Sequence, residues 1–514
     1  MNAELLDSVM MQVGVVAALR SMSTSGLTTG VVVTASHNLE VDNGAKIADP
    51  TGEMMKEVWE GYATRLANAE TDVDFFREMQ LIAEAEDLDF TIPANVFIGR
   101  DTRKHSLKLS KAVACGVRAL GGTVTDFNLA TTPQLHQYVR SANLGEAVGE
   151  VAYYDKLEAA FRKIAIDSND YHRLTLNPLA IEGNRCKLPL EPLSIDCANG
   201  VGAGKMVELA HRLRSIIPIT LFNTGEGGLN VFSGAEYVQK EKKMPDGVHE
   251  LVPGQKFCSF DGDADRIVYF FVGEKKQMQL LDGDRQIALC AIFFAEQLAK
   301  AGITDLNIGT VQTAYANGAS TKYIKEELKV PCFYAKTGVK YLHHKAVDFD
   351  IGIYYEANGH GTVIFKKEAL EHIRRHHYTT AAQRDARDML LAVSELAHQA
   401  VGDAIGDMLM IEAILALKDW SLADWASLYT DLPSKMDKVV VADRTQITTN
   451  DDETQCLEPE GLQVFIDAVV ARYPGGRSFV RPSGTEDIVR VFAEASSEEE
   501  ANSLAMEVMQ LVWD

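Results

Sequence analysis

The sequence predicts an α/β protein built from three similar α/β rounds, followed by a smaller α+β segment at the C-terminus. Short apolar runs of strand length alternate with stretches of helical periodicity, and several runs end directly in a polar loop rich in Gly, Asp or Ser. This alternation is typical of strand–helix–strand units in layered α/β proteins. The 514 residues suffice for three or four domains at roughly 100–200 residues per domain.

The first round is expected over residues 1–147. Apolar residues at helical spacing from Leu5 to Leu19 indicate an opening helix. The run Val31-Val-Val-Thr34 indicates a buried strand that ends in a polar loop. The remaining expected elements are a strand over 95–99, a helix over 106–120 and a strand over 123–127.

Two further rounds, over 148–283 and 284–432, repeat this pattern, and a distinct tail covers 433–514. Their expected strands are 193–196, 256–260, 308–311 and 350–355, and their expected helices end at Leu213 or cover 284–301 and 366–400. The tail is expected to hold strands over 438–441 and 488–493 and helices over 457–471 and 497–512. No low-complexity linker separates these segments, so we expect closely packed domains.

The composition is typical of a globular chain and leaves a small anionic ligand possible. The 50 Lys and Arg residues against 73 Asp and Glu residues give a net charge of −23, which repels phosphate backbones and anionic lipids. We therefore expect no nucleic acid and no membrane partner. The seven cysteines form no C-x-x-C pair, as expected of a reduced intracellular chain. The acidic first residues resemble no signal peptide, so we expect a cytoplasmic protein. We also expect a monomer.

The segment Asp261-Gly-Asp-Ala-Asp-Arg266 directly follows a predicted strand. Three carboxylates at alternate positions can converge on a hard cation such as Mg²⁺. An EF-hand loop is excluded because its sixth position requires Gly and holds Arg266. That arginine adds the positive charge which a site for metal and phosphate needs. A solvated acidic turn and a metal-dependent phosphatase are the alternatives.

The loop Thr34-Ala-Ser-His-Asn38 places the Ser36 hydroxyl at the end of a predicted strand. A serine in such a loop, beside His and Asn, can act as a nucleophile or carry a phosphoryl group. The alternative is a polar turn that caps the next element.

The segment Phe479–Arg490 is a candidate phosphate cradle. Arg481 and Arg490 offer forked donors, and Gly484 lets backbone N–H groups approach an anion. The hydroxyls of Ser483 and Thr485 add further donors. On a chain as acidic as this one, such a basic cluster is informative, although an ordinary turn between strands is the alternative.

The loop Glu356-Ala-Asn-Gly-His-Gly361 follows the strand expected over 350–355. Glu, Asn and His on a flexible loop suit sugar hydroxyls and proton transfer, or form a plain polar turn. The other clustered histidines lie in charged helical stretches, where we expect a solvated face: His343, His344, His372, His376 and His377.

Together and in this order, the four loops resemble the phosphoserine, metal, sugar and phosphate loops of the α-D-phosphohexomutase superfamily. They are most similar to its branch that acts on N-acetylglucosamine phosphates, as are segments 312–318 and 336–340, and the similarity covers essentially the whole chain. The resemblance implies four domains with mixed sheets around a central cleft, one loop from each. It also implies interconversion of N-acetylglucosamine 6-phosphate and 1-phosphate, through a phosphoserine and a sugar bisphosphate, for UDP-N-acetylglucosamine synthesis.

The resemblance assigns roles residue by residue. Ser36 matches the serine that is phosphorylated, and one Mg²⁺ would be held by Ser36, Asp261, Asp263 and Asp265. Lys46 and His360 match groups that exchange a proton, and a sugar bisphosphate would act as activator. The residues that match substrate contacts are Arg266, Lys336, Glu356, Asn358, Arg481, Ser483, Gly484, Thr485 and Arg490.

Two features depart from the superfamily pattern. Leu39 stands where Pro usually follows His-Asn. Members also begin with a strand and a Gly-Thr-x-Gly-Phe-Arg-like segment, whereas this chain starts inside the first helix, so we expect its first domain to lack that strand and arginine. A catalytically impaired sugar-phosphate binding protein is therefore an alternative to the active mutase, and a sugar phosphatase is another.

Overall fold

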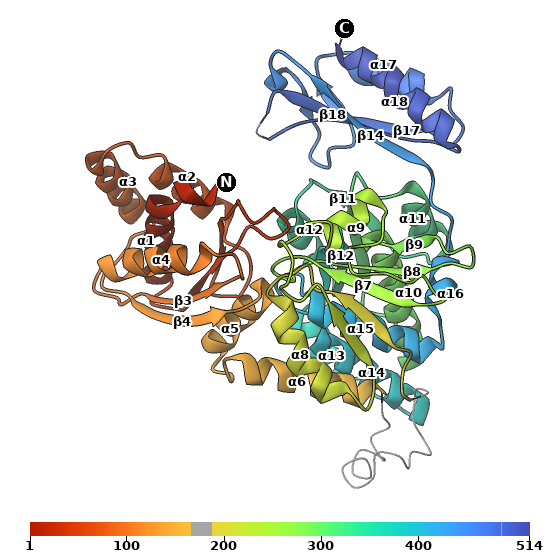
Figure 1. Ribbon diagram of the computed structural model, residues 1–514, viewed down its shortest axis with the longest axis horizontal. Coiled ribbons are helices and arrows are strands. Elements are labelled where there is room, and N and C mark those ends of the chain that lie inside the picture. The colour runs from red at the N-terminus through yellow and green to blue at the C-terminus, as the bar shows by residue number, and fades with distance from the viewer. Residues whose placement is uncertain (166–187, 485, 514) are drawn as a thin grey trace. The chain divides into compact units, whose positions relative to one another are not determined.

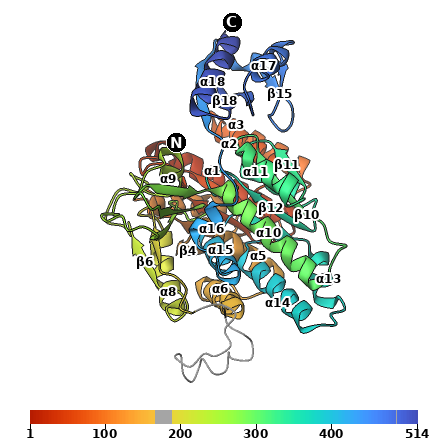
Figure 2. The ribbon, with the colours of Figure 1, turned by 90° about the vertical axis from the view of Figure 1, so that its right-hand side faces the viewer.

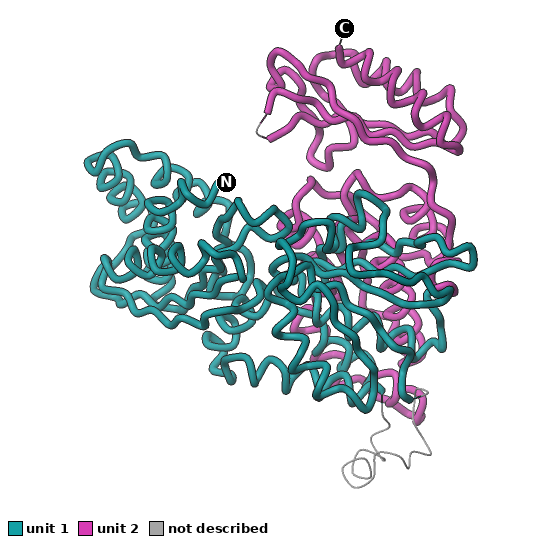
Figure 3. The backbone as a smooth tube through the Cα atoms, in the orientation of Figure 1, with its two compact units in different colours: residues 1–282, 358–362, 388–422 teal, residues 283–357, 363–387, 423–514 magenta. Residues whose placement is uncertain are grey.

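The computed structural model describes residues 1–165, 188–484 and 486–513. The chain divides into two compact units, drawn in teal and magenta in Figure 3. The first comprises Met1–Asp282, Asn358–Thr362 and Asp388–Leu422, and the second comprises Gly283–Ala357, Val363–Arg387 and Ala423–Asp514. Of the helices in the described ranges, none combines the length and apolarity that crossing a membrane requires.

The first unit opens with a mixed four-stranded sheet in the order β2-β1-β3-β4. Strand β1 runs antiparallel to β2 and parallel to β3, and β3 runs parallel to β4. Helices α1, α4 and α5 contact these strands. The elements are α1 (Asp7–Ser23), β1 (Thr29–Val33), β2 (Ala45–Ala48), β3 (Asn95–Arg100), α4 (Ser106–Ala119), β4 (Thr123–Leu129) and α5 (Thr132–Leu144).

Two glycines allow α1 and α4 to pack backbone against backbone. A Cβ atom on Gly14 would lie 2.0 Å from the Val113 carbonyl oxygen, and one on Gly116 would lie 1.9 Å from that of Met11. Any larger residue would force the helices apart, so glycine is required at both positions. This contact fixes the position of the α1 and α4 helices, which both contact β1, the strand that leads to Ser36.

Four helices of this region, α5 and three others, were not predicted from the sequence. Helices α2 (Glu57–Ala67) and α3 (Asp72–Ala85) lie between β2 and β3 in the chain, and α6 (Glu150–Ala165) follows α5. Helix α3 begins at Thr71, whose hydroxyl accepts the N–H of Asp74, a common N-terminal cap.

A five-stranded mixed sheet in the order β6-β5-β7-β8-β9 completes the first unit. Strands β5, β6 and β7 are parallel, whereas β8 and β9 continue the sheet antiparallel. A buried ion pair of 2.7 Å between Lys256 on β7 and Glu412 on α15 holds α15 against this sheet. The elements are β5 (Leu193–Asp196), α8 (Gly202–Leu213), β6 (Ile219–Phe222), α9 (Ala235–Glu241), β7 (Lys256–Phe260), β8 (Ile267–Val272), β9 (Met278–Leu281) and α15 (Ala404–Lys418).

The second unit contains a four-stranded sheet in the order β11-β10-β12-β13. Strand β10 is parallel to both neighbours, and Figure 2 shows α10 running alongside β10 and β12, which it contacts. The elements are α10 (Gly283–Ala301), β10 (Ile308–Thr313), α11 (Gly318–Lys322), β11 (Cys332–Ala335), α12 (Val339–Ala346), β12 (Ile351–Tyr355), β13 (Gly361–Phe365), α13 (Lys367–Arg375) and α16 (Leu422–Ala426). The chain passes from the second unit to the first within α14 (Ala381–Leu396).

The C-terminal part of this unit is an antiparallel sheet, β14-β18-β17, with two helices on one face (Figure 1). A helix predicted over 457–471 begins only at Leu462, because Pro459 and Gly461 interrupt it and the preceding residues form a short strand. The elements are β14 (Ser434–Val440), β15 (Thr448–Thr449), β16 (Cys456–Glu458), α17 (Leu462–Val470), β17 (Arg477–Pro482), β18 (Ile488–Glu494) and α18 (Glu498–Trp513).

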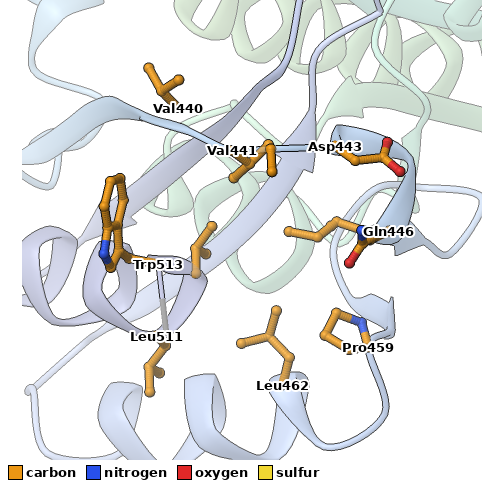
Figure 4. A pocket seen from close by; sticks show the side chains of 11 residues that line it. Val440, Val441, Asp443, Gln446, Pro459, Leu462, Leu511 and Trp513 are labelled. Carbon is orange, nitrogen blue, oxygen red and sulfur yellow. The ribbon is translucent and has the colours of Figure 1, made fainter.

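A pocket of about 460 Å³ lies in this C-terminal part, between the end of β14 and the ends of α17 and α18 (Figure 4). Its described lining carries one carboxylate, Asp443, and no basic side chain, so it does not suit a phosphate. The lining residues are Val440, Val441, Ala442, Asp443, Gln446, Ile447, Pro459, Leu462, Leu511, Val512 and Trp513.

Candidate active site

The tight connection between β7 and β8 gathers three buried carboxylates. Asp261, Asp263 and Asp265 are each at most 2% exposed, and each offers one oxygen within 4.8 Å of the others. Ala264 adopts a positive φ of 57°, a conformation that lets the loop reverse between two antiparallel strands. The convergence predicted from the alternating acids is therefore confirmed.

Ser36 meets this cluster directly. Its hydroxyl donates to Asp261 Oδ2 at 2.7 Å and lies 3.5 Å from Asp265 Oδ1. The other oxygen of Asp261 accepts the backbone N–H groups of Asp265 and Arg266, at 3.0 and 3.2 Å. The loop's own backbone thus orients Asp261, which leaves its second oxygen for the serine.

Lys46 reaches the cluster from β2. Its ammonium group donates to Asp263 Oδ2 at 2.7 Å and to Asp265 Oδ2 at 2.5 Å. Burial alone would lower the pKa of Lys46, but the carboxylates of Asp263 and Asp265 outweigh it and raise that pKa well above its ordinary value. Burial and the two neighbouring acids raise the pKa of Asp261 well above its usual range.

The donor set suits a hard divalent cation. Within the described residues, Asp263 Oδ1 is a buried oxygen without a hydrogen-bond partner, although buried polar atoms are normally satisfied. Three acids face two nearby cations, Lys46 and Arg266. Convergent carboxylate oxygens, one of them unsatisfied, suit Mg²⁺, which prefers oxygen ligands.

The backbone of the serine loop is held in an unusual conformation. Ser36 has a φ of 51°, which costs energy for a residue with a side chain. Its carbonyl oxygen accepts from the Asn230 amide at 2.9 Å and from the Arg103 guanidinium at 3.2 Å. Both donors also bind the Asn38 carbonyl oxygen, so they clamp the loop on each side of His37.

His360 and Arg266 lie next to the acidic loop. The two residues form an isolated antiparallel bridge, and His360 Nε2 is 3.6 Å from Asp265 Oδ2. Burial lowers the pKa of His360 to about 4 although Asp265 opposes this. Arg266 donates to Glu236 Oε2 at 2.8 Å, which holds its guanidinium beside the carboxylates.

The predicted sugar loop divides between the two units. In the first unit, Asn358 Oδ1 accepts the backbone N–H of His360 at 3.0 Å. In the second, a Glu356 carboxylate oxygen accepts the N–H of Gly338 at 3.2 Å. Lys336 is exposed, and its ammonium group lies 5.3 Å from the centre of the Tyr341 ring.

The predicted phosphate loop connects β17 to β18 in the second unit. Arg481 and Arg490 are direct partners on these antiparallel strands, and Ser483 and Gly484 follow at the turn. Thr485 lies outside the described residues. Arg481 Nε donates to Glu453 at 2.9 Å. The other oxygen of that carboxylate accepts the N–H and hydroxyl of Thr337, at 2.9 and 2.5 Å.

The structure thus assembles the predicted residues into two groups, each within one unit. Ser36, Lys46, the three aspartates, Arg266, Asn358 and His360 lie in the first, and Lys336, Glu356 and the described residues of the arginine loop lie in the second. The roles of all these residues, and the domain boundaries, stay predictions.

Three residues that contact the serine loop or the metal loop had no predicted role: Arg103, Thr132 and Asn230. Arg103 follows a predicted strand in an Arg-Asp-Thr-Arg segment, which could have marked it as a loop residue of the same sheet edge. Asn230 gives no local signal, because it lies 194 residues from Ser36 in the chain.

Family models match three segments of the chain. The model described as phosphoacetylglucosamine mutase AMG1, domain III, matches residues 282–420. The C-terminal domain of phosphoglucomutase/phosphomannomutase matches residues 436–511, and the alpha/beta/alpha domain I of the same family matches residues 79–149.

Curated relatives match along the whole chain. Phosphoacetylglucosamine mutase of Sus scrofa is 48% identical over 520 residues, which cover 100% of this chain and 92% of the relative. The Homo sapiens protein of the same name is 47% identical with the same coverage. The Arabidopsis thaliana protein is 42% identical and covers 99% of this chain and 93% of its own.

Solved structures agree in fold. An N-acetylglucosamine-phosphate mutase in its substrate complex has a TM-score of 0.92 and 41% identity, covering 100% of this chain and 94% of its own. Aspergillus fumigatus N-acetylphosphoglucosamine mutase with GlcNAc-6P and magnesium has a TM-score of 0.91 and 42% identity, covering 100% and 93%. A serine-to-alanine variant of that enzyme with glucose 1,6-bisphosphate has a TM-score of 0.89 and 42% identity, with the same coverage.

The sequence similarity and the fold similarity extend over the same residues as the loops described above. The predicted fold class, mixed-sheet α/β domains with a smaller C-terminal domain, is confirmed by the matching family models. With 48% identity to a relative across its full length, the chain belongs to the phosphoacetylglucosamine mutase family of the α-D-phosphohexomutase superfamily.

Proposed function

We propose that the protein interconverts N-acetylglucosamine 6-phosphate and N-acetylglucosamine 1-phosphate through a phosphoserine at Ser36 and a sugar bisphosphate intermediate. The observation that carries this proposal is the Ser36 hydroxyl, which lies 2.7 Å from Asp261 Oδ2 inside a buried triad of aspartates. A buried serine that faces metal-type ligands suits phosphoryl transfer better than hydrolysis by free water.

The proposed chemistry begins with phosphoserine at Ser36. One Mg²⁺ per chain, held by Asp261, Asp263, Asp265 and the serine group, would neutralise charge on the transferring phosphoryl oxygens. Arg103 and Asn230 hold the loop backbone while the side chain reacts. Lys46 and His360 are the groups proposed to exchange a proton with the sugar hydroxyl, because both lie against the carboxylate of Asp265.

The remaining predicted residues are proposed to bind substrate. Glu356 and Asn358 would bind sugar hydroxyls, and Lys336 and Arg266 would bind further anionic oxygens. The arginine loop would bind the phosphate that does not react, through Arg481, Ser483, Gly484, Thr485 and Arg490. Since one phosphoserine serves two ends of the sugar, this loop must accept the bisphosphate in either orientation, and a sugar bisphosphate would also serve as activator.

We further propose four functional domains, each contributing one loop: 1–147 with the phosphoserine, 148–283 with the metal loop, 284–432 with the sugar loop and 433–514 with the phosphate loop. The enzyme would act as a cytoplasmic monomer, and its 1-phosphate product would serve UDP-N-acetylglucosamine synthesis.

A coupled assay tests the proposal. The protein is supplied with N-acetylglucosamine 6-phosphate, Mg²⁺ and a trace of sugar bisphosphate, and the 1-phosphate is followed. We expect Ser36→Ala to lower kcat by a factor on the order of 10³ or more and to retain sugar-phosphate binding. Ser110→Ala is the matched control, because it removes a buried hydroxyl that bonds only the helix carbonyl of Leu107 in the described structure.

Three results would contradict the proposal. Full mutase turnover by Ser36→Ala would show that the reaction does not pass through a phosphoserine at Ser36. Release of inorganic phosphate instead of isomer would indicate a phosphatase. Sugar-phosphate binding without turnover in the wild type would indicate a binding protein.

A further inference from the structure

The start of helix α5 meets the metal loop. Thr131 caps this helix: its hydroxyl accepts the N–H of Gln134 at 3.1 Å, and the Gln134 side chain accepts the N–H of Thr131 at 3.2 Å. This reciprocal pair satisfies the first turn of the helix. The hydroxyl of the next residue, Thr132, is therefore not needed as a cap and points elsewhere.

Thr132 makes two contacts with a single residue of the metal loop. Its hydroxyl donates to Asp263 Oδ2 at 2.6 Å, and its backbone N–H donates to the Asp263 carbonyl oxygen at 3.2 Å. Thr132 is 2% exposed and Asp263 is fully buried. One contact fixes the main chain of the aspartate, and the other fixes the rotation of its carboxylate.

These contacts give the two carboxylate oxygens of Asp263 different surroundings. Oδ2 already accepts from Lys46 at 2.7 Å, so the threonine hydroxyl gives this oxygen a second strong donor. Oδ1 accepts nothing from the described residues. The positive end of α5 also lies beside the carboxylate and favours its charged form. One oxygen of the aspartate is thus bound by protein groups, and the other is left for a cation.

We propose that Thr132 is a positioning residue for the metal site, acting through Asp263 and touching neither metal nor substrate. It selects Oδ1 as the ligand atom by occupying Oδ2. The inference rests on the proposed Mg²⁺ site. Groups that orient metal ligands in this way typically change metal affinity by about 10–100-fold when they are removed.

The test measures Mn²⁺ binding to the full-length protein by electron paramagnetic resonance, without sugar. Mn²⁺ shares the preference of Mg²⁺ for oxygen ligands. Thr132→Val keeps the shape of the side chain and removes its hydroxyl, and we expect Mn²⁺ affinity to fall about 10-fold or more. Thr132→Ser restores the hydroxyl and should bind within about 2-fold of the wild type. In steady-state assays at saturating sugar, the Mg²⁺ requirement of Thr132→Val should rise similarly.

Thr131→Val separates orientation from folding, because it removes the cap of the same helix without touching Asp263. We expect it to lower the melting temperature but to leave Mn²⁺ affinity within about 2-fold of the wild type. Three results overturn the inference: wild-type affinity in Thr132→Val, failure of Thr132→Ser to restore affinity, or an equal loss in Thr131→Val. Absence of Mn²⁺ binding by the wild type would instead overturn the proposed metal site itself.

Discussion

Asp403 is a buried carboxylate with no part in the proposed chemistry. It caps α15, where its Oδ1 accepts the N–H of Ile405 at 3.1 Å, and Tyr153 donates to its Oδ2 at 2.7 Å. The next residue, Ala404, donates its N–H to the Ala264 carbonyl oxygen of the metal loop at 3.0 Å. Burial raises the pKa of Asp403 to about 6, although these donors oppose it.

This raised pKa predicts a pH-dependent stability. Between pH 4 and pH 6 the folded protein keeps a proton on Asp403 that the unfolded chain releases, so the free energy of unfolding falls as pH rises, by at most about 3 kcal/mol. Asp403→Asn cannot ionise. We therefore expect the stability of this variant, relative to the wild type, to improve by about 1–3 kcal/mol from pH 4 to pH 7 in urea unfolding experiments.

Asp443→Asn is the control for this experiment. Asp443 also caps a helical turn but is exposed, and the hydroxyl and N–H of Thr445 hold the pKa of its carboxyl below the usual value. Asp443→Asn should lose stability relative to the wild type as pH rises, which is opposite to the trend expected for Asp403→Asn. An equal change in the free energy of unfolding by Asp403→Asn at pH 4 and at pH 7 would contradict the raised pKa of Asp403.

At the scale of elements, the serine loop and the metal loop touch at a glycine. A Cβ atom on Gly262 would lie 2.6 Å from the Ser36 carbonyl oxygen and 2.9 Å from Asn230 Nδ2. The two loops can approach only because this position has no side chain. The clamp on the Ser36 carbonyl oxygen and the position of the serine hydroxyl therefore depend on Gly262.

We expect Gly262→Ala to displace the Ser36 backbone and to lower kcat about 100-fold, since small misplacements of reacting groups cost that much. The free energy of unfolding should fall by only about 1–3 kcal/mol. Gly204→Ala on α8 is the control: apart from its chain neighbours and its own helix backbone, no atom of the described residues lies within 4 Å of its added Cβ, so both activity and stability should be kept. Unchanged mutase turnover in Gly262→Ala would show that the loop contact does not position the serine.

Elements with strong local patterns could be predicted from the sequence, and contacts between distant loops could not. Strand β7 was predicted within its observed bounds because a short run with Phe257, Cys258 and Phe260 directly precedes an acidic loop. Helices α2 and α3 were not predicted, and they bury few residues: Trp59 and Leu66 in α2 and Ile82 in α3. The contacts of Thr132 with Asp263 and of Asn230 with Ser36 span 131 and 194 residues. No local spacing encodes such pairs; they depend on how whole layers pack.

At the scale of the whole molecule, the charge is strongly negative, yet the proposed substrate is an anion. The net charge of −23 requires that affinity for a sugar phosphate come from a few local cations. Arg490 is exposed on β18 and contributes little to the core, so its side chain should matter for binding and not for folding.

Arg490→Ala should weaken binding of N-acetylglucosamine 6-phosphate at least 10-fold in calorimetry, because it removes a charge-assisted phosphate contact. Its melting temperature should stay close to that of the wild type. Arg472→Ala makes the same change in net charge at an exposed ion pair with Glu507, so it should bind the ligand normally. A comparable loss of affinity in both variants would assign the effect to overall charge instead of the phosphate loop.

The pairing of Arg481 with Arg490 across neighbouring strands has a consequence for ligand choice. Two like charges placed opposite each other on a sheet repel, and Glu453, the carboxylate that accepts from Arg481, offsets only part of this repulsion. A phosphate bound there, as proposed, would act as a counter-ion that reduces this repulsion, whereas a neutral sugar would not. On this proposal, β17 and β18 would favour charged over uncharged sugars as well as forming part of the C-terminal sheet.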